Sequence, residues 1–98
     1  MNEAQKTKCR LAILRTSVYN AITRFSVGAT AEQVYDFLSK AWTHRKVEMS
    51  RADVAAAVQW CIEQEHIIEM NGGLFKHVHP YILSVDYKTC EAKPRRAA

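Results

Sequence analysis

Cysteine and histidine side chains give this sequence its first candidate chemistry, which is metal binding. The side chains concerned are Cys61, His66, His77 and His79. His77 and His79 are two positions apart, so on a strand both would point to the same face and could reach one ion. Tetrahedral zinc sites use closely spaced ligand pairs such as C-x2-C, and the sequence has no such pair. We therefore expect no bound metal, and we expect Cys61 to be a small apolar core residue.

Nucleophilic catalysis is the second candidate chemistry. Cys9 or Cys90 could form a dyad with a histidine that lies close in space, although both cysteines are near the ends of the sequence. The sequence contains no Gly-rich phosphate loop, no G-x-S-x-G motif and no recognisable catalytic pair of acidic residues. We therefore expect neither an enzymatic activity nor a cofactor.

Phosphate binding by basic side chains is the third candidate, and its strength depends on where the formal net charge of +4 lies. Residues 1–30 carry five bases and one acid, and residues 71–98 carry five bases and two acids. Residues 31–70 carry four bases and seven acids. The two ends are basic and the middle is acidic, so attraction to a polyanion is expected mainly from the ends.

Length, apolar content and cysteine usage limit the class of protein. A chain of 98 residues that is 48% hydrophobic can form one globular domain. It has no run of 18 apolar residues and no signal-peptide pattern, so we expect no membrane segment and a cytoplasmic location. Three widely spaced cysteines do not suggest a disulfide framework, and we expect reduced thiols.

Apolar residues at steps of three and four predict three helices. These helices are expected at about residues 5–25, 31–42 and 51–65. The second should begin at a capping box formed by Thr30 and Gln33, and the third at Ser50, with Asp53 in the third helical position. The third helix should turn its apolar stripe inward. This stripe consists of Val54, Ala57, Val58, Cys61 and Ile62.

A β-hairpin is predicted directly after the third helix. Residues 67–70 and 74–78 can form its strands, and Asn71-Gly72-Gly73 can form its turn, because Asn and Gly tolerate positive φ. Residues 81–87 could form a further strand or a packed extension. We expect a single domain over residues 1–91. A disordered basic tail is expected to follow at residues 92–98, because this segment contains Pro94 and Arg95-Arg96.

This order of elements resembles the winged helix-turn-helix superfamily. The stretch from Ser50 to Ile68 and the Asn71-Gly72-Gly73 turn carry the resemblance, which covers about residues 9–79. It implies an α+β, mostly α fold: three helices, a C-terminal β-hairpin wing and a short C-terminal extension. It also implies a small DNA-binding regulatory protein that places its third helix in the major groove.

The resemblance assigns roles to particular residues. Arg51 would contact guanine, Gln59 would contact adenine, and Ala55 would touch a thymine methyl group or allow close approach. Arg45, Lys46 and Lys76 would hold phosphates, and the basic ends would add non-specific attraction. The full predicted set is Arg45, Lys46, Ser50, Arg51, Ala55, Gln59, Lys76 and His77. A homodimer through the first helix or the C-terminal strand would suit paired half-sites.

The composition of the third helix also supports an alternative. Its outward face is rich in alanine, and Glu63 and Glu65 lie at its C-terminal end, where they would repel phosphates. The alternative is a protein-binding winged-helix module, acting as an adaptor, an inhibitor or an accessory factor. In that case the same alanine-rich face would dock on a protein partner.

Overall fold

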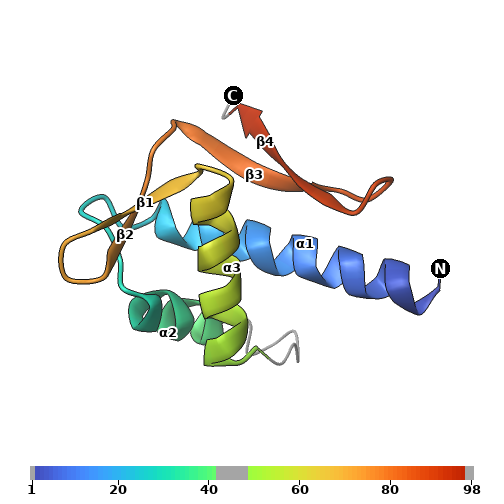
Figure 1. Cartoon of the computed structure of the whole chain (residues 1–98), viewed down its shortest axis with the longest axis horizontal. Helices are drawn as coiled ribbons and strands as arrows, with labels where there is room; N and C mark the ends of the chain where they lie inside the picture. Colours follow the sequence, from blue (N-terminus) through green and yellow to red (C-terminus); the bar gives the residue numbers. More distant parts are fainter. Residues whose placement is uncertain (1, 42–48, 97–98) are drawn as a thin grey trace.

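The computed structural model describes residues 2–41 and 49–96, and in this part of the chain three helices precede two β-hairpins (Figure 1). The fold is therefore α+β and mostly helical. The elements are α1 (Glu3–Ile22), α2 (Ala31–Ala41), α3 (Arg51–Glu63), β1 (Ile67–Met70), β2 (Leu74–His77), β3 (Tyr81–Asp86) and β4 (Glu91–Arg96). Among the described residues, no helix is both long and apolar enough to cross a bilayer.

Each of these helices begins at a capping box. In this motif two residues that are three positions apart bond to each other, and the side-chain oxygen of each accepts a hydrogen bond from the backbone N–H of the other. The pairs are Asn2 with Gln5, Thr30 with Gln33, and Ser50 with Asp53. The second and third boxes confirm the sequence prediction. The first box was not predicted. Its cap at Asn2 explains why α1 begins at Glu3 and not near residue 5.

Helix α3 ends two residues earlier than predicted, because the chain adopts a left-handed conformation at Glu65. The N–H of His66 donates to the carbonyl of Cys61 (2.9 Å), and the N–H of Glu65 donates to the carbonyl of Ile62 (3.0 Å). This pair of bonds is a Schellman motif, which usually has glycine at the left-handed position. The motif turns the chain directly from α3 into β1.

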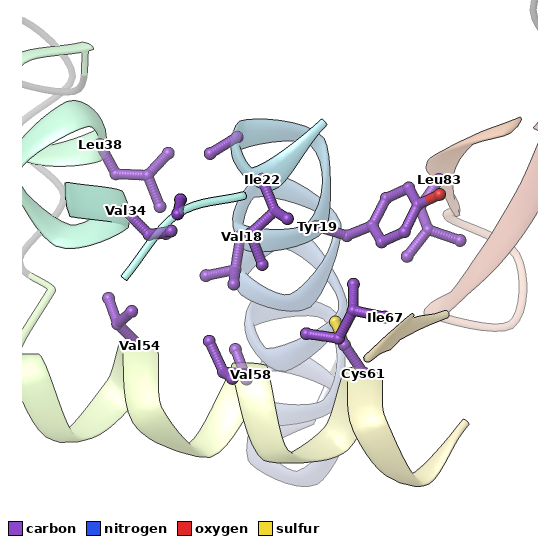
Figure 2. Close-up of a cluster of buried hydrophobic side chains, with 13 residues drawn as sticks. Val18, Tyr19, Ile22, Val34, Leu38, Val54, Val58, Cys61, Ile67 and Leu83 are labelled. Atoms are coloured by element: carbon purple, nitrogen blue, oxygen red, sulfur yellow. The ribbon is translucent and has the colours of Figure 1, made fainter. Parts of the chain in front are cut away.

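The core lies where the three helices meet the first strands of the two hairpins (Figure 2). Val54, Val58 and Cys61 of α3 point toward α1 and α2, as the apolar stripe predicts. The other labelled core residues are Val18, Tyr19, Ile22, Val34, Leu38, Ile67 and Leu83. Cys61 is fully buried, and burial raises the pKa of its thiol to about 12, so it is an inert core residue.

The β1–β2 hairpin has the predicted turn at Asn71-Gly72-Gly73, and both glycines have positive φ. A short β-bridge attaches this hairpin to the segment between α1 and α2. Ala29 and Phe75 exchange two backbone hydrogen bonds, of 2.9 and 2.7 Å. Gly28 precedes the bridge at a φ of +99°, and a Cβ there would lie 3.0 Å from the Met70 side chain. Glycine is therefore required beside the bridge.

Strands β3 and β4 form a second hairpin that packs along α1, so the prediction of a disordered tail at residues 92–98 is wrong for the part that the structure describes. Ala92 packs toward the core, whereas Glu91 and Lys93 are exposed. This alternation is the pattern of a strand with one buried face. Pro94 was interpreted as a signal for disorder, but proline is compatible with an edge strand.

Side chains of α1 complete the backbone pairing of β3. The amide of Asn20 donates to the carbonyl of Leu83 (2.9 Å), and its oxygen accepts from the N–H of Leu83 (3.0 Å). The hydroxyl of Tyr19 donates to the carbonyl of Tyr81 (2.8 Å). Leu83 is opposite Pro94 in β4, and its backbone groups point away from β4 toward Asn20. The missing N–H of Pro94 therefore costs the sheet no hydrogen bond.

Cys9 of α1 and Cys90, just before β4, form a disulfide, which corrects the expectation of reduced thiols. The two residues are 81 positions apart in the sequence. The bond fastens the N-terminal half of α1 to the turn end of the β3–β4 hairpin. Cysteine spacing alone did not reveal the pair, because only the packing of the hairpin on α1 brings the two segments together.

Candidate nucleic-acid interface

The outward face of α3 carries the predicted base-contacting residues, and the structure leaves that face uncovered by other described elements. Ala55 and Gln59 are exposed, as are the neighbouring Ala52 and Ala56. Alanine side chains let another surface approach the helix backbone closely. Gln59 is the polar side chain at the centre of this face, and its amide has the donor and acceptor geometry that matches adenine.

Arg51, the predicted guanine-contacting residue, is paired with an acidic side chain of α2. Its guanidinium donates two hydrogen bonds to the carboxylate of Glu32 in α2, from Nε (3.0 Å) and from Nη2 (2.8 Å). It also lies 4.5 Å from the ring centroid of Tyr35. The bond from Arg51 holds the pKa of Glu32 below its usual value, and Glu32 raises the pKa of Arg51. Arg51 thus joins α3 to α2 through a two-pronged ion pair.

The N-terminus of α3 is also occupied by its own cap. The hydroxyl of Ser50 accepts a hydrogen bond from the N–H of Asp53 (3.1 Å), and the Asp53 carboxylate accepts one from the N–H of Ser50 (2.9 Å). An anion at a helix N-terminus is stabilised by the helix dipole. Here Asp53 takes that place, which disfavours a phosphate at the same position. Arg45 and Lys46, the predicted phosphate-binding pair, lie outside the described residues.

The hairpin places Lys76 and His77 on opposite faces. Lys76 is opposite Ile68, and His77 is opposite Ile67, which is buried in the core. The Nδ1 atom of His77 is buried and has no hydrogen-bond partner among the described residues. Lys76 can therefore reach a ligand outside the hairpin, whereas that ring nitrogen of His77 cannot.

A cluster of aromatic side chains beyond the C-terminus of α3 was not predicted. His66 is buried, and its Nδ1 atom is 2.6 Å from the hydroxyl of Tyr81. Its ring packs 5.8 Å from Tyr19 and 5.4 Å from Trp60, and the guanidinium of Arg15 lies 4.9 Å from the Trp60 ring. Burial, and then the nearby His79, lower the pKa of His66, so the neutral ring is favoured. The cluster joins α3 to the β3–β4 hairpin.

The cysteine and histidine side chains that were considered as metal ligands do not gather into a site. Cys61 is enclosed by core residues, His66 is bonded to Tyr81, and His79 stacks on the Tyr81 ring at 5.1 Å. Within residues 2–41 and 49–96, no group of three or more potential ligands is arranged to hold a metal ion.

The arrangement that remains as a candidate site is the uncovered face of α3 next to the β1–β2 hairpin. Comparisons of the chain with protein-family models, curated proteins and solved structures found no match.

Proposed function

We propose that this chain is a winged helix-turn-helix protein that binds double-stranded DNA, with α3 in the major groove and the β1–β2 hairpin as its wing. The observation that carries the proposal is the arrangement around α3. Helices α1 and α2 pack against its inward face, and its outward face stays exposed beside the hairpin. The Ala29–Phe75 bridge adds support, because it gives the hairpin a third, very short strand between the first two helices.

The proposed contacts differ in one respect from those that the sequence suggested. Gln59 is the base-contacting side chain, and the alanines around Ala55 admit the helix into the groove. Lys76, together with Arg45 and Lys46, supplies phosphate contacts. We assign Arg51 a role in positioning α3 and not in contacting bases, because its guanidinium is paired with Glu32 of α2. By occupying its site, the protein would act as a regulator of transcription.

A fluorescence anisotropy titration with duplex DNA at about 50 and 200 mM salt tests this function, because phosphate contacts make affinity strongly salt-dependent. We expect Ala55→Glu to weaken duplex binding by about tenfold or more, since one lost or repelled contact in the groove costs about 1–3 kcal/mol. Ala55→Gln is the matched control, because it has the same size without the charge. Failure of the unaltered protein to bind duplex at the lower salt concentration would refute the proposal, and so would equal binding by the two variants.

A specific observation favours a second function, which is docking of the same α3 face on a protein. Arg51 is neutralised by Glu32, and the exposed Asp53 and Glu63 leave the face without a free cation among the described residues. A photo-crosslinking amino acid at position 55, activated in cells, separates the two functions. An adduct that nuclease removes supports DNA, and an adduct that only protease removes supports a protein partner.

A further inference from the structure

The basic residues of the two chain ends, far apart in the sequence, lie on α1 and on the β3–β4 hairpin, which the Cys9–Cys90 disulfide joins to α1. Both the start of α1 and the β3–β4 turn lie at the right-hand end of Figure 1, and the β1–β2 hairpin lies at the left. We call this surface the basic end. Its exposed cations are Lys6, Lys8 and Arg10 on α1, Lys88 in the β3–β4 turn, and Lys93 and Arg95 on β4. Lys6 and Arg10 share one side of α1, and Lys8 lies on the other side, near Glu91. Arg95 is opposite Ile82, so the surface extends along β4 away from the disulfide.

The charge of the basic end is only partly balanced. Lys6 lies 3.6 Å from Glu3, Lys8 lies 3.9 Å from Glu91, and Lys93 lies 3.5 Å from Asp86. Six bases less these three acids leave a net charge of +3. Within the described residues, the guanidinium groups of Arg10 and Arg95 and the ammonium of Lys88 form no ion pair. These three cations are therefore available to anions from outside.

We infer that the basic end is a second nucleic-acid contact surface, which binds the phosphate backbone of duplex DNA independently of base sequence. The inference rests on the proposed function and adds a site that lies apart from α3. A disulfide and the packing of β4 on α1 hold the cations of two segments in fixed relative positions. A fixed array of separated cations suits the regular phosphates of a duplex, and each contact releases counterions.

The same surface is poorly suited to insertion into a membrane. A helix that lies in a membrane surface gathers its large apolar residues on one face. On the N-terminal half of α1, the exposed Leu11 and Ile13 are two positions apart and thus point in nearly opposite directions around the helix. Binding to anionic lipid is accordingly the outcome that the experiment must separate from binding to DNA.

The test compares the salt dependence of duplex binding for two variants. The triple variant Arg10→Gln, Lys88→Gln and Arg95→Gln removes the three unpaired cations, and Arg24→Gln removes an exposed arginine outside the basic end. The duplex should have about 20 base pairs, which at about 3.4 Å per pair exceeds the length of the molecule. Circular dichroism melting verifies that both variants fold like the unaltered protein.

We expect the plot of log affinity against log salt to become shallower by about 2–3 for the triple variant, since each phosphate contact contributes about 0.9. The loss should be equal on unrelated duplex sequences, and Arg24→Gln should leave the slope unchanged. If duplex binding is weakened by Ala55→Glu but not by the triple variant, the inference is wrong and the proposed function stands. If the unaltered protein binds vesicles of phosphatidylserine but no duplex, both are wrong.

Discussion

The exposed face of α3 and the basic end differ in how their charges are arranged, although both are exposed surfaces of the same small fold. On α3, the only described arginine is bonded to Glu32, and acidic residues flank the face. At the basic end, three cations are left without acidic partners among the described residues. The first surface suits close contact, and the second suits long-range attraction.

The two surfaces also differ in what holds them in place. Helix α3 is fixed by core packing of Val54, Val58 and Cys61 and by its ion pair to α2. The basic end is fixed by a disulfide and by hydrogen bonds from Asn20 and Tyr19 to β3. The two surfaces therefore depend on different parts of the sequence for their structure, and mutations can alter one without the other.

Removal of the disulfide should have the largest effect. We expect Cys9→Ser combined with Cys90→Ser to lower the free energy of unfolding by about 2–5 kcal/mol, because the unfolded chain regains the freedom of a long loop. Urea unfolding followed by circular dichroism measures the change. A reductant should destabilise the unaltered protein and have no further effect on the double variant. Equal stability of the two proteins would mean that packing alone holds the basic end together.

Asn20→Ala should have the next largest effect, because it leaves the backbone N–H and carbonyl of Leu83 without their partner. Two unpaired, partly buried polar groups should cost about 1–3 kcal/mol of unfolding free energy. Asn20→Asp is the control, since it keeps the acceptor and loses the donor. Faster amide hydrogen exchange in β3 than in α3 would place the damage at the hairpin, whereas uniform exchange would contradict the separation of the two regions.

Glu32→Gln should give the α3 face an unpaired cation, which is the feature that distinguishes the basic end. It removes one acid and weakens the hold on the Arg51 guanidinium, so Arg51 becomes available to a phosphate or a base. Duplex affinity should rise severalfold, and the salt slope should become steeper by about 1, the value for one added phosphate contact. Anisotropy titrations measure both. Asp36→Gln, on the same helix but paired with Lys40, is the comparison variant, and an equal gain there would point to net charge alone.

Acidification should have the smallest effect on the free energy of unfolding. It acts through His66, in the aromatic cluster that joins α3 to the β3–β4 hairpin. Burial lowers the pKa of His66 from its ordinary value of 6.5, so below that value the unfolded chain binds protons more readily than the folded chain. The free energy of unfolding should therefore fall as the pH decreases from 7.5 to 5, and should level off below the pKa of the folded state. Urea unfolding across this range should show a weaker decrease for His66→Gln than for His79→Gln.

Local patterns predicted the local structure well. The spacing of apolar residues and the Thr30 and Ser50 caps located α2 and α3, because helix starts depend on residues three apart. The Asn71-Gly72-Gly73 turn located the first hairpin for the same reason. The exposed face of α3, including Ala55 and Gln59, followed from helical periodicity.

Features that join distant segments could not be predicted in this way. Arg51 and Glu32 are 19 positions apart, and their pairing depends on the angle at which α2 meets α3. Strand β4 was missed because Pro94 and the adjacent basic residues suggested disorder, and because its partner β3 was itself ambiguous. The buried Nδ1 of His77 could not be inferred, since its strand was known but not which face would turn inward.

The hairpin edges have a consequence for how copies of this protein meet. An edge strand with free N–H and carbonyl groups is a template for another chain, and such templates lead to aggregation. Here Asn20 satisfies the middle of β3, and Pro94 offers no N–H at the corresponding point of β4. Crowded copies should therefore not polymerise by adding strands at this hairpin, and a dimer through the C-terminal strand would have to use side-chain packing.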